Sequence, residues 1–267
     1  MNLPIYQVDA FTSKLFGGNP AAVCPLEKWL PDDVMQKLAA ENNLSETAFF
    51  VKQNGQYQLR WFTPEFEIDL CGHATLASAF IIFNELNYDS DTIYFTCKSG
   101  LLEVKKKNNL IELNFPARMP AETESSEILL KAFNIAPQKV LKSRDYFLLY
   151  NSEQEIKELI ANFQYLNQLN TVGIIVTAKG DETDFVSRFF VPNSVIGEDP
   201  VTGSSHCSLI PYWSKLLNKN VLTAKQLSKR GGELFCENKN ERVAIAGEAV
   251  LYMKGEYYVS LNQDFLD

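Results

Sequence analysis

Two histidines mark the residues of this chain that could do chemistry. The 267-residue sequence contains only His73 and His206, and the local sequences His-Ala-Thr-Leu and His-Cys-Ser-Leu resemble each other. Each histidine follows a glycine-containing loop and precedes an apolar run that predicts a buried helix. The N–H groups at a helix start are unpaired within the helix, and the helix dipole there favours an anion. A histidine in that position can donate to a ligand or transfer a proton.

Glu46 is the first candidate for a general acid/base. It directly precedes the apolar segment 47–51, which predicts a strand. A carboxylate beside an apolar core can exchange protons near neutral pH, whereas a glutamate at a solvated strand edge is a surface residue. Residue type alone favours the surface interpretation.

Asp199, Gly203 and Ser204 form a second candidate group, in the segment that precedes His206. An acid followed by Pro200 and Gly203 is typical of a turn and a helix cap. The functional interpretation makes Asp199 a second acid/base or a ligand contact. Ser204 and the neighbouring N–H groups would then hold a carboxylate, as Gly72 and His73 would in the other loop.

Cys71 and Cys207 lie next to the two histidines and raise the alternative of thiol chemistry. Thiols at helix starts can have a lowered pKa, as the paired thiols of a racemase require, but buried cysteine is more often inert. When the histidines are aligned, Cys71 matches Ser204 and Cys207 matches Ala74, so the thiols are out of register. No third metal ligand stands near either histidine in the sequence, and no metal site is predicted.

Three sequence features occur in the same order in both halves of the chain, which indicates that the chain is a doubled unit. Segments 60–64 and 188–192 precede the two histidine motifs, and matching apolar positions follow Gly100 and Gly232. We therefore expect two homologous halves, each a strand-rich sheet around a central helix. The polar segment 116–127 is the expected linker, which gives domains at 1–120 and 121–267. A cleft between facing halves is the expected place for a small-molecule site.

The net charge, the apolar runs and the cysteines of the sequence restrict which binding partners and which cellular location we expect. The formal net charge is −8, which argues against nucleic acid or an anionic membrane as the main partner. The N-terminal residues lack the basic and apolar regions of a signal peptide, and no apolar run is long enough to span a bilayer. Five cysteines without a Cys-x-x-Cys pair fit a reducing cytoplasm, so we expect a cytoplasmic protein.

The ordered motifs resemble those of the PhzF-like isomerase family, which is related in fold to diaminopimelate epimerase. The resemblance covers nearly the whole chain and is carried by seven segments: 6–11, 16–23, 43–49, 60–64, 72–77, 198–206 and 226–232. It implies an α+β fold of two pseudo-symmetric halves, no metal or organic cofactor, and often a homodimer. It also implies that Glu46 moves a proton on the substrate and that His73, Asp199 and Ser204 line the site.

The sequence thus predicts a cofactor-independent isomerase that acts on a small carboxylate-bearing molecule. Glu46 is the predicted general acid/base, and the predicted ligand contacts are Gly72, His73, Asp199, Gly203 and Ser204. A thiol-dependent epimerase using Cys71 and Cys207 remains an alternative. A non-catalytic small-molecule binding protein on the same scaffold is the third interpretation.

Overall fold

The computed structural model describes residues 2–259, which divide into two compact units. The first unit comprises the described residues up to Phe16, Pro20–Leu113, and the described residues from Glu248 on. The second comprises Gly17–Asn19 and Asn114–Gly247. A division at residue 120 therefore differs from these units at 17–19, at 114–120 and from Glu248 on. The last of these differences arises because β18 (Ala249–Tyr258) hydrogen-bonds to β1 (Asn2–Ala10) and belongs with it.

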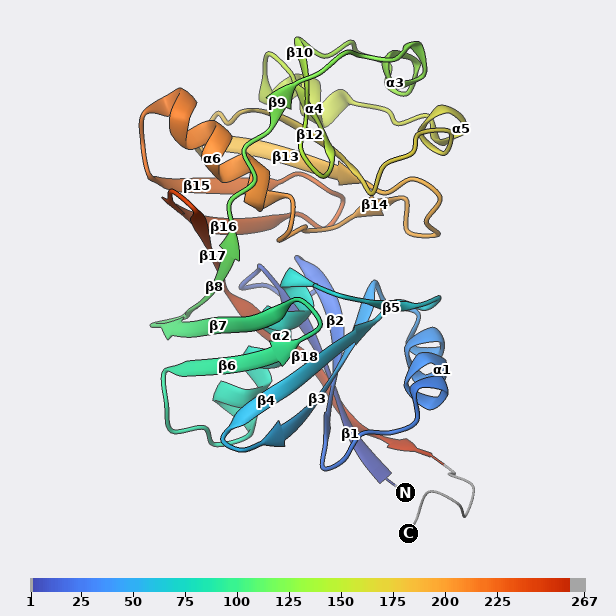
Figure 1. The fold of residues 1–267 in the computed structure, drawn as a ribbon, viewed down its shortest axis with the longest axis vertical. Coiled ribbons are helices and arrows are strands. Elements are labelled where there is room, and N and C mark those ends of the chain that lie inside the picture. The colour runs from blue at the N-terminus through green and yellow to red at the C-terminus, as the bar shows by residue number, and fades with distance from the viewer. Residues whose placement is uncertain (1, 260–267) are drawn as a thin grey trace. The chain divides into compact units, whose positions relative to one another are not determined.

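The first unit is rich in strands and contains two helices among its described residues (Figure 1). Its elements are β1 (Asn2–Ala10), β2 (Asn19–Leu26), α1 (Asp32–Asn42), β3 (Glu46–Gln53), β4 (Gln56–Phe62), β5 (Glu67–Ile68), α2 (Gly72–Glu85), β6 (Thr92–Cys97), β7 (Gly100–Lys107), β8 (Leu110–Pro116) and β18 (Ala249–Tyr258). The chain passes into the second unit within β8.

The α2 helix is the centre of this unit because it is apolar all round. Eleven of its fourteen residues are buried, and it packs against strands β1, β3, β7 and β18. A helix without a polar face must be enclosed by other elements. Its few hydroxyls are satisfied internally, since Ser78 donates to the Ala74 carbonyl oxygen at 2.7 Å and Thr75 donates to that of Cys71. The expectation of a loop entering a buried helix at residues 70–86 is confirmed.

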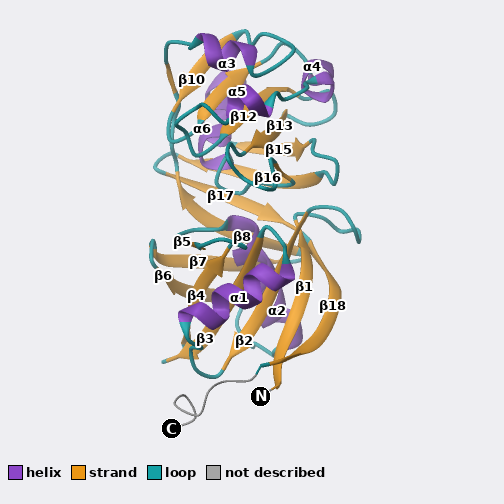
Figure 2. Cartoon of the chain, turned by 90° about the vertical axis from the view of Figure 1, so that its right-hand side faces the viewer, coloured by secondary structure: helices purple, strands orange, loops and turns teal. Residues whose placement is uncertain are grey.

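Strand β3 is buried on both faces between the two helices. Phe49 and Val51 pack in a cluster with Met35 and Ala39 of α1, while the pleat turns Ala48 and Phe50 to the opposite side. Figure 2 shows both helices against the strands of this unit. The first residue of β3, Glu46, is therefore fixed at the edge of a packed core.

The second unit has its own strands and one long helix. Its elements are β9 (Ala121–Glu122), α3 (Glu127–Lys131), β10 (Lys139–Lys142), β11 (Tyr146–Leu149), α4 (Glu153–Glu158), α5 (Phe163–Leu166), β12 (Ile174–Lys179), β13 (Phe185–Phe190), β14 (Glu198–Asp199), α6 (His206–Leu217), β15 (Val221–Gln226), β16 (Gly232–Lys239) and β17 (Arg242–Gly247). The α6 helix packs on β15, β16 and β17.

The two units repeat one pairing pattern, so the doubled unit is confirmed. In the first, β2 to β3 is parallel, β3 to β4 antiparallel, β4 to β6 parallel, and β6 to β7 to β8 antiparallel. In the second, β11 to β12 is parallel, β12 to β13 antiparallel, β13 to β15 parallel, and β15 to β16 to β17 antiparallel. The fold is thus α+β, with a strand-rich sheet around one main helix in each unit.

An arginine–glutamate pair recurs at the same place in both repeats. Arg60 of β4 donates from Nε and Nη2 to the carboxylate of Glu67 in β5, at 2.7 and 2.9 Å. Arg188 of β13 makes the same two contacts, at the same distances, with Glu198 of β14. Each pair holds the short strand that leads toward the following helix. This contact gives a structural reason for the arginine that begins both repeated segments, 60–64 and 188–192.

Three local sequence patterns predict something other than what the structure shows. Ser152 and the acids that follow it predict one helix over 152–166, but the structure has two short helices, α4 and α5, separated by extended Leu159, and Asn162 caps the second. The segments 248–253 and 256–260 predict two strands, but they lie in the single strand β18, and residue 260 lies outside the described residues. Pro211 is expected in the first turn of a helix over 207–217, but it is the sixth residue of α6. It lacks an N–H group, so the Cys207 carbonyl four residues earlier accepts from the Arg118 N–H instead, at 2.8 Å.

We expect the repeated arginine to matter for stability far more than an exposed ion pair. Arg60→Met should lower the free energy of unfolding by about 2 kcal/mol or more, because a bidentate, largely buried pair loses one partner. Lys37→Met removes the exposed Lys37–Asp33 pair and should cost under about 0.5 kcal/mol. Guanidinium unfolding curves of both variants test this, and equal losses would contradict it.

Candidate active site

The first unit brings Glu46 and His73 into contact. Glu46 Oε2 lies 3.0 Å from His73 Nε2, although 27 residues separate them in the chain. Glu46 is the first residue of β3 and His73 is the second of α2, so two core elements position the two side chains. The Glu46 Oε2 atom is buried and accepts no aligned hydrogen bond from the described residues, so the two groups approach as an ion pair. The carboxylate side chain as a whole is 15% exposed, which leaves it reachable.

Cys71 contacts the other side of the same imidazole. Its Sγ atom is 3.5 Å from His73 Nδ1, and both residues are buried. Burial, followed by the nearby Glu46 carboxylate, raises the pKa of the Cys71 thiol to about 11. The favoured interpretation of a buried, inert thiol is therefore supported, and the alternative of a pKa lowered by the helix start is not, because loss of water around the sulfur outweighs the dipole. Near neutral pH the thiol stays protonated.

His73 is buried between two acidic groups. Burial opposes protonation of the ring, but the negative charges that Cys71 and Glu46 can carry favour it more, and the pKa of His73 is held well above its usual range. Since the thiol is protonated near neutral pH, the neighbour that can offer the ring a negative charge there is the Glu46 side chain. The arrangement places a proton donor and a proton acceptor side by side.

The three side chains also form a group of potential metal ligands. One ligand atom from each of Glu46, Cys71 and His73 lies within 4.8 Å of the other two. The expectation that no third ligand lies near either histidine is thus wrong for His73, because Glu46 comes from a distant segment. The imidazole faces Cys71 with Nδ1 and Glu46 with Nε2. A metal held through one nitrogen would point away from the other neighbour, so the geometry fits proton transfer better than chelation.

Gly72 is the first residue of α2 and is buried. Cys71 precedes it in an extended conformation and gives no side-chain cap. The N–H groups of the first helical turn have no i−4 carbonyl partner within the helix. They therefore point out of the helix start on which His73 also lies, and this is the arrangement that the sequence predicted for holding an anion.

Asp199 lies in the second unit with both carboxylate oxygens engaged. Its Oδ1 accepts from Asn19 Nδ2 at 2.7 Å, and its Oδ2 accepts from Thr202 Oγ1 at 2.5 Å. The Gln226 side chain donates to the Asp199 carbonyl and to the Thr202 hydroxyl. Asp199 thus organises the loop that carries Gly203 and Ser204, and this loop precedes α6.

Ser204 has a partner that the sequence analysis missed. Arg144 Nη2 donates to Ser204 Oγ at 3.0 Å, and Arg144 also binds the buried carboxylate of Asp145. Arg144 lies in the turn between β10 and β11, sixty residues before Ser204. No local pattern marks that turn, since β10 itself has only four residues, so tertiary structure alone reveals the contact.

His206 is a structural histidine. It is completely buried, its Nδ1 lies 2.8 Å from the Thr202 carbonyl oxygen, and its ring packs beside that of Phe185. Burial lowers the pKa of His206 to about 4, so the ring is neutral near pH 7. The repeat therefore has an ionisable histidine in the first unit and an uncharged one in the second. Whether the predicted ligand contacts of the two units meet at one ligand stays a prediction.

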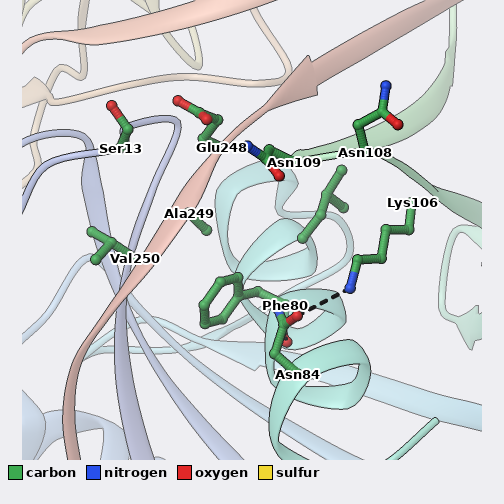
Figure 3. Close-up of a pocket in the computed structure, with 10 residues that line it drawn as sticks. Ser13, Phe80, Asn84, Lys106, Asn108, Asn109, Glu248, Ala249 and Val250 are labelled. Atoms are coloured by element: carbon green, nitrogen blue, oxygen red, sulfur yellow. Dashed lines mark hydrogen bonds between the residues drawn. The ribbon is translucent and has the colours of Figure 1, made fainter.

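A surface pocket of about 340 Å³ lies elsewhere in the first unit. Figure 3 shows Phe80, Asn84 and Lys106 around it, with Lys106 Nζ 3.1 Å from the Asn84 side-chain oxygen. Phe80 and Asn84 lie seven and eleven residues after His73 on α2, which places them roughly 10–17 Å along the helix axis. The pocket contains none of the predicted site residues, and its position separates it from the Glu46–His73 contact.

None of the described helices is long and apolar enough to cross a membrane.

Comparisons with known proteins cover nearly the whole chain. A family model described as phenazine biosynthesis-like protein matches residues 8–255. An uncharacterized isomerase of Pseudomonas aeruginosa is 48% identical over 259 residues, which cover 97% of this chain and all of that protein. A crystal structure of a PhzF-family protein from Enterococcus faecalis has a TM-score of 0.94 at 50% identity and covers 97% of this chain and all of that one.

A more distant structure shows how widely the fold is used. A hydroxyproline epimerase from Agrobacterium vitis, solved with bound trans-4-hydroxy-L-proline, has a TM-score of 0.61 at 7% identity. The match covers 96% of this chain and 92% of that chain. At this identity the likeness concerns the fold alone.

The burial of His206 predicts a specific pH dependence of stability. Its folded pKa of about 4 lies below the ordinary value of 6.5, so the unfolded chain binds a proton more readily and stability falls as pH drops below 6.5. Between pH 7.5 and pH 5 the loss from this group should be about 2 kcal/mol. In His206→Asn this part of the pH dependence should vanish, as measured by urea unfolding at both pH values. An unchanged pH dependence in the variant would show that His206 is accessible to protons in the folded chain.

Proposed function

Because the chain belongs to the PhzC–PhzF family of phenazine biosynthesis-like proteins, we propose that it is a cofactor-independent isomerase of small carboxylate-bearing molecules. Glu46 is the proposed general acid/base. The single observation that carries this proposal is the 3.0 Å contact between Glu46 and His73 at the edge of a packed core. It gives the carboxylate a fixed position and a charged partner, whereas a surface glutamate would have neither.

The proposed reaction is a balanced proton transfer. The C–H bond next to the activated carbon of the substrate breaks, its proton goes to Glu46, and its electron pair enters a conjugated double bond. Glu46 then returns the proton to another carbon, or to the opposite face of the same carbon, and no net oxidation occurs. His73 lies beside the Glu46 carboxylate before that group takes up the proton and after it returns it; between the two steps Glu46 is the neutral acid.

Developing negative charge on the substrate carboxylate needs fixed donors. We assign this role to the backbone N–H groups around Gly72 and His73 and to those around Gly203 with the Ser204 hydroxyl. Asp199 supports the second group, since its carboxylate is tied to Asn19 and Thr202 within the same loop. A homodimer in the cytoplasm, without nucleic-acid or membrane partners, completes the proposal.

Thiol-dependent epimerisation is the second candidate, and the Cys71–His73 contact is the observation in its favour. Against it, burial raises the pKa of both Cys71 and Cys207 to about 11, so neither sulfur is a ready base near neutral pH. The fold resembles that of an epimerase, but that likeness concerns the fold alone. A binding protein without activity is the third candidate, and the loss of exchange predicted below distinguishes it.

Glu46→Gln should keep the fold and ligand binding while losing turnover by a factor on the order of a hundred or more, because the amide cannot accept the proton. The measurement is uptake of deuterium from solvent into a carboxylate metabolite that first stabilises the protein in a thermal-shift screen. Glu41→Gln, at an exposed position on α1, is the matched control and should exchange normally. Normal exchange by the Glu46 variant would remove the assignment.

Cys71→Ser combined with Cys207→Ser should retain deuterium exchange within a few-fold of the unmodified protein. A serine hydroxyl fits both sites and cannot replace a thiolate base. The same assay reports the outcome, with a melting curve to confirm that the double variant is folded. Loss of exchange in the folded double variant, together with retention in Glu46→Gln, would assign the protein to the thiol-dependent class.

A further inference from the structure

The turn between β10 and β11 is fastened to the first turn of α6 within the second unit. Ser143 Oγ lies 2.8 Å from Ser208 Oγ, and Arg144 Nη2 lies 3.0 Å from Ser204 Oγ. The Asp145 carboxylate, whose side chain is only 2% exposed, receives Arg144 Nε at 3.1 Å and Nη2 at 2.7 Å. A buried carboxylate therefore fixes the plane of the guanidinium.

These contacts determine whether the Ser204 hydroxyl can donate a hydrogen bond to a ligand or accept one from it. The hydroxyl has one hydrogen to donate and accepts through its oxygen. Arg144 donates to that oxygen, and the Ser204 hydroxyl hydrogen has no acceptor among residues 2–259. Ser204 is therefore a donor held ready for an acceptor supplied from outside the chain, as a carboxylate oxygen would be.

The guanidinium itself has donors to spare. Its Nε and Nη2 atoms serve Asp145 and Ser204, while Nη1 makes no hydrogen bond within the described part of the chain. The Arg144 side chain is 31% exposed, so these N–H groups can be reached from solvent. One ligand could therefore contact the Ser204 hydroxyl and the free edge of Arg144 together.

A second arginine makes this surface positive. The Arg118 N–H donates to the Cys207 carbonyl that Pro211 leaves open. The charges of Arg118 and Arg144 both act on the Cys207 thiol and favour a lower pKa there, although burial raises it more, so both guanidinium groups lie near the first turn of α6. Asp145 offsets the charge of Arg144, but Arg118 forms no ion pair within the described ranges. The region thus carries a net positive charge in a chain whose formal net charge is −8. Such a local field favours an anion with more than one charge.

We propose that Arg144 is a specificity-determining residue that selects ligands with a second carboxylate beside the one that Ser204 binds. The ligand class is a compact dicarboxylate rather than a monocarboxylate. The inference rests on the proposed function only in taking Ser204 as a substrate contact. Arg144 suits this task because a guanidinium binds carboxylates through paired N–H groups in a fixed plane.

Binding of succinate and of butyrate, measured by isothermal titration calorimetry, tests the proposal. The two probes have the same chain length and differ in the second carboxylate. We expect the intact protein to bind succinate about tenfold or more tighter than butyrate, because one charge-assisted contact is added. Arg144→Met should abolish that ratio with little change for butyrate, and Arg144→Lys should restore part of it.

Three further variants keep the result interpretable. Arg144→Met leaves the buried Asp145 without its cation, so the double variant Arg144→Met with Asp145→Asn removes both charges if the single variant does not fold. Ser204→Ala should weaken both probes and preserve their ratio. Arg242→Met, which removes an arginine bonded to Asn114 on the exposed side of β17, is the matched control and should change neither.

Several outcomes would overturn the proposal. These are equal affinity for the two probes, no measurable succinate binding, or an unchanged ratio in a folded Arg144 variant. Orthophosphate serves as a third probe, and an Arg144-dependent gain for phosphate but not for succinate would also overturn the dicarboxylate class. These measurements involve binding alone, so their failure leaves the Glu46 assignment standing, and normal exchange by Glu46→Gln leaves the ligand preference standing.

Discussion

The structure depends on the burial of α2 together with a histidine at its start. An apolar helix of fourteen residues must be surrounded, and the strands that surround it also enclose His73. A buried imidazole needs a charged or polar partner, and Glu46 at the start of β3 supplies it at 3.0 Å. The same packing that stabilises the first unit thus brings Glu46 and His73 together. Shifting β3 by one residue would turn Glu46 to the other face and break the pair.

The two units share one fold, but the histidines at the starts of their main helices have different surroundings. Arg60–Glu67 and Arg188–Glu198 hold equivalent short strands in the two units. The histidines that follow have diverged, because His73 faces a carboxylate whereas His206 bonds a backbone carbonyl oxygen in a dry core. Burial without a counter-charge lowers the pKa of His206, and burial beside an anion raises that of His73. The first unit therefore carries the Glu46–His73 contact, and the second carries Ser204 with its guanidinium partner.

The cysteines illustrate why residue type does not decide reactivity. Cys71 and Cys207 both lie at helix starts, where a dipole favours a thiolate, yet their burial raises each pKa to about 11. Desolvation of a whole charge outweighs the partial charge of a helix end. In the proposed mechanism the sulfur of Cys71 packs against His73 while Glu46 transfers the proton. The proposed mechanism therefore assigns the proton transfer to Glu46, whose side chain is 15% exposed, and not to a buried thiol.

The sequence by itself determined the doubled unit and the buried α2 helix, because hydrophobic periodicity and repeated motifs are local signals. Glu46 became a candidate through the resemblance to a family, since residue type alone favoured a surface glutamate, and His73 through its place at a helix start. Contacts between distant segments required the tertiary structure. The pairing of β18 with β1, the approach of Glu46 to His73 and the bond from Arg144 to Ser204 each join residues that no local pattern connects. The break between α4 and α5 and the position of Pro211 within α6 were likewise missed, since caps and partner carbonyls there come from elsewhere in the fold. Local patterns fix which elements form, whereas packing decides which side chains meet and which of them lose water.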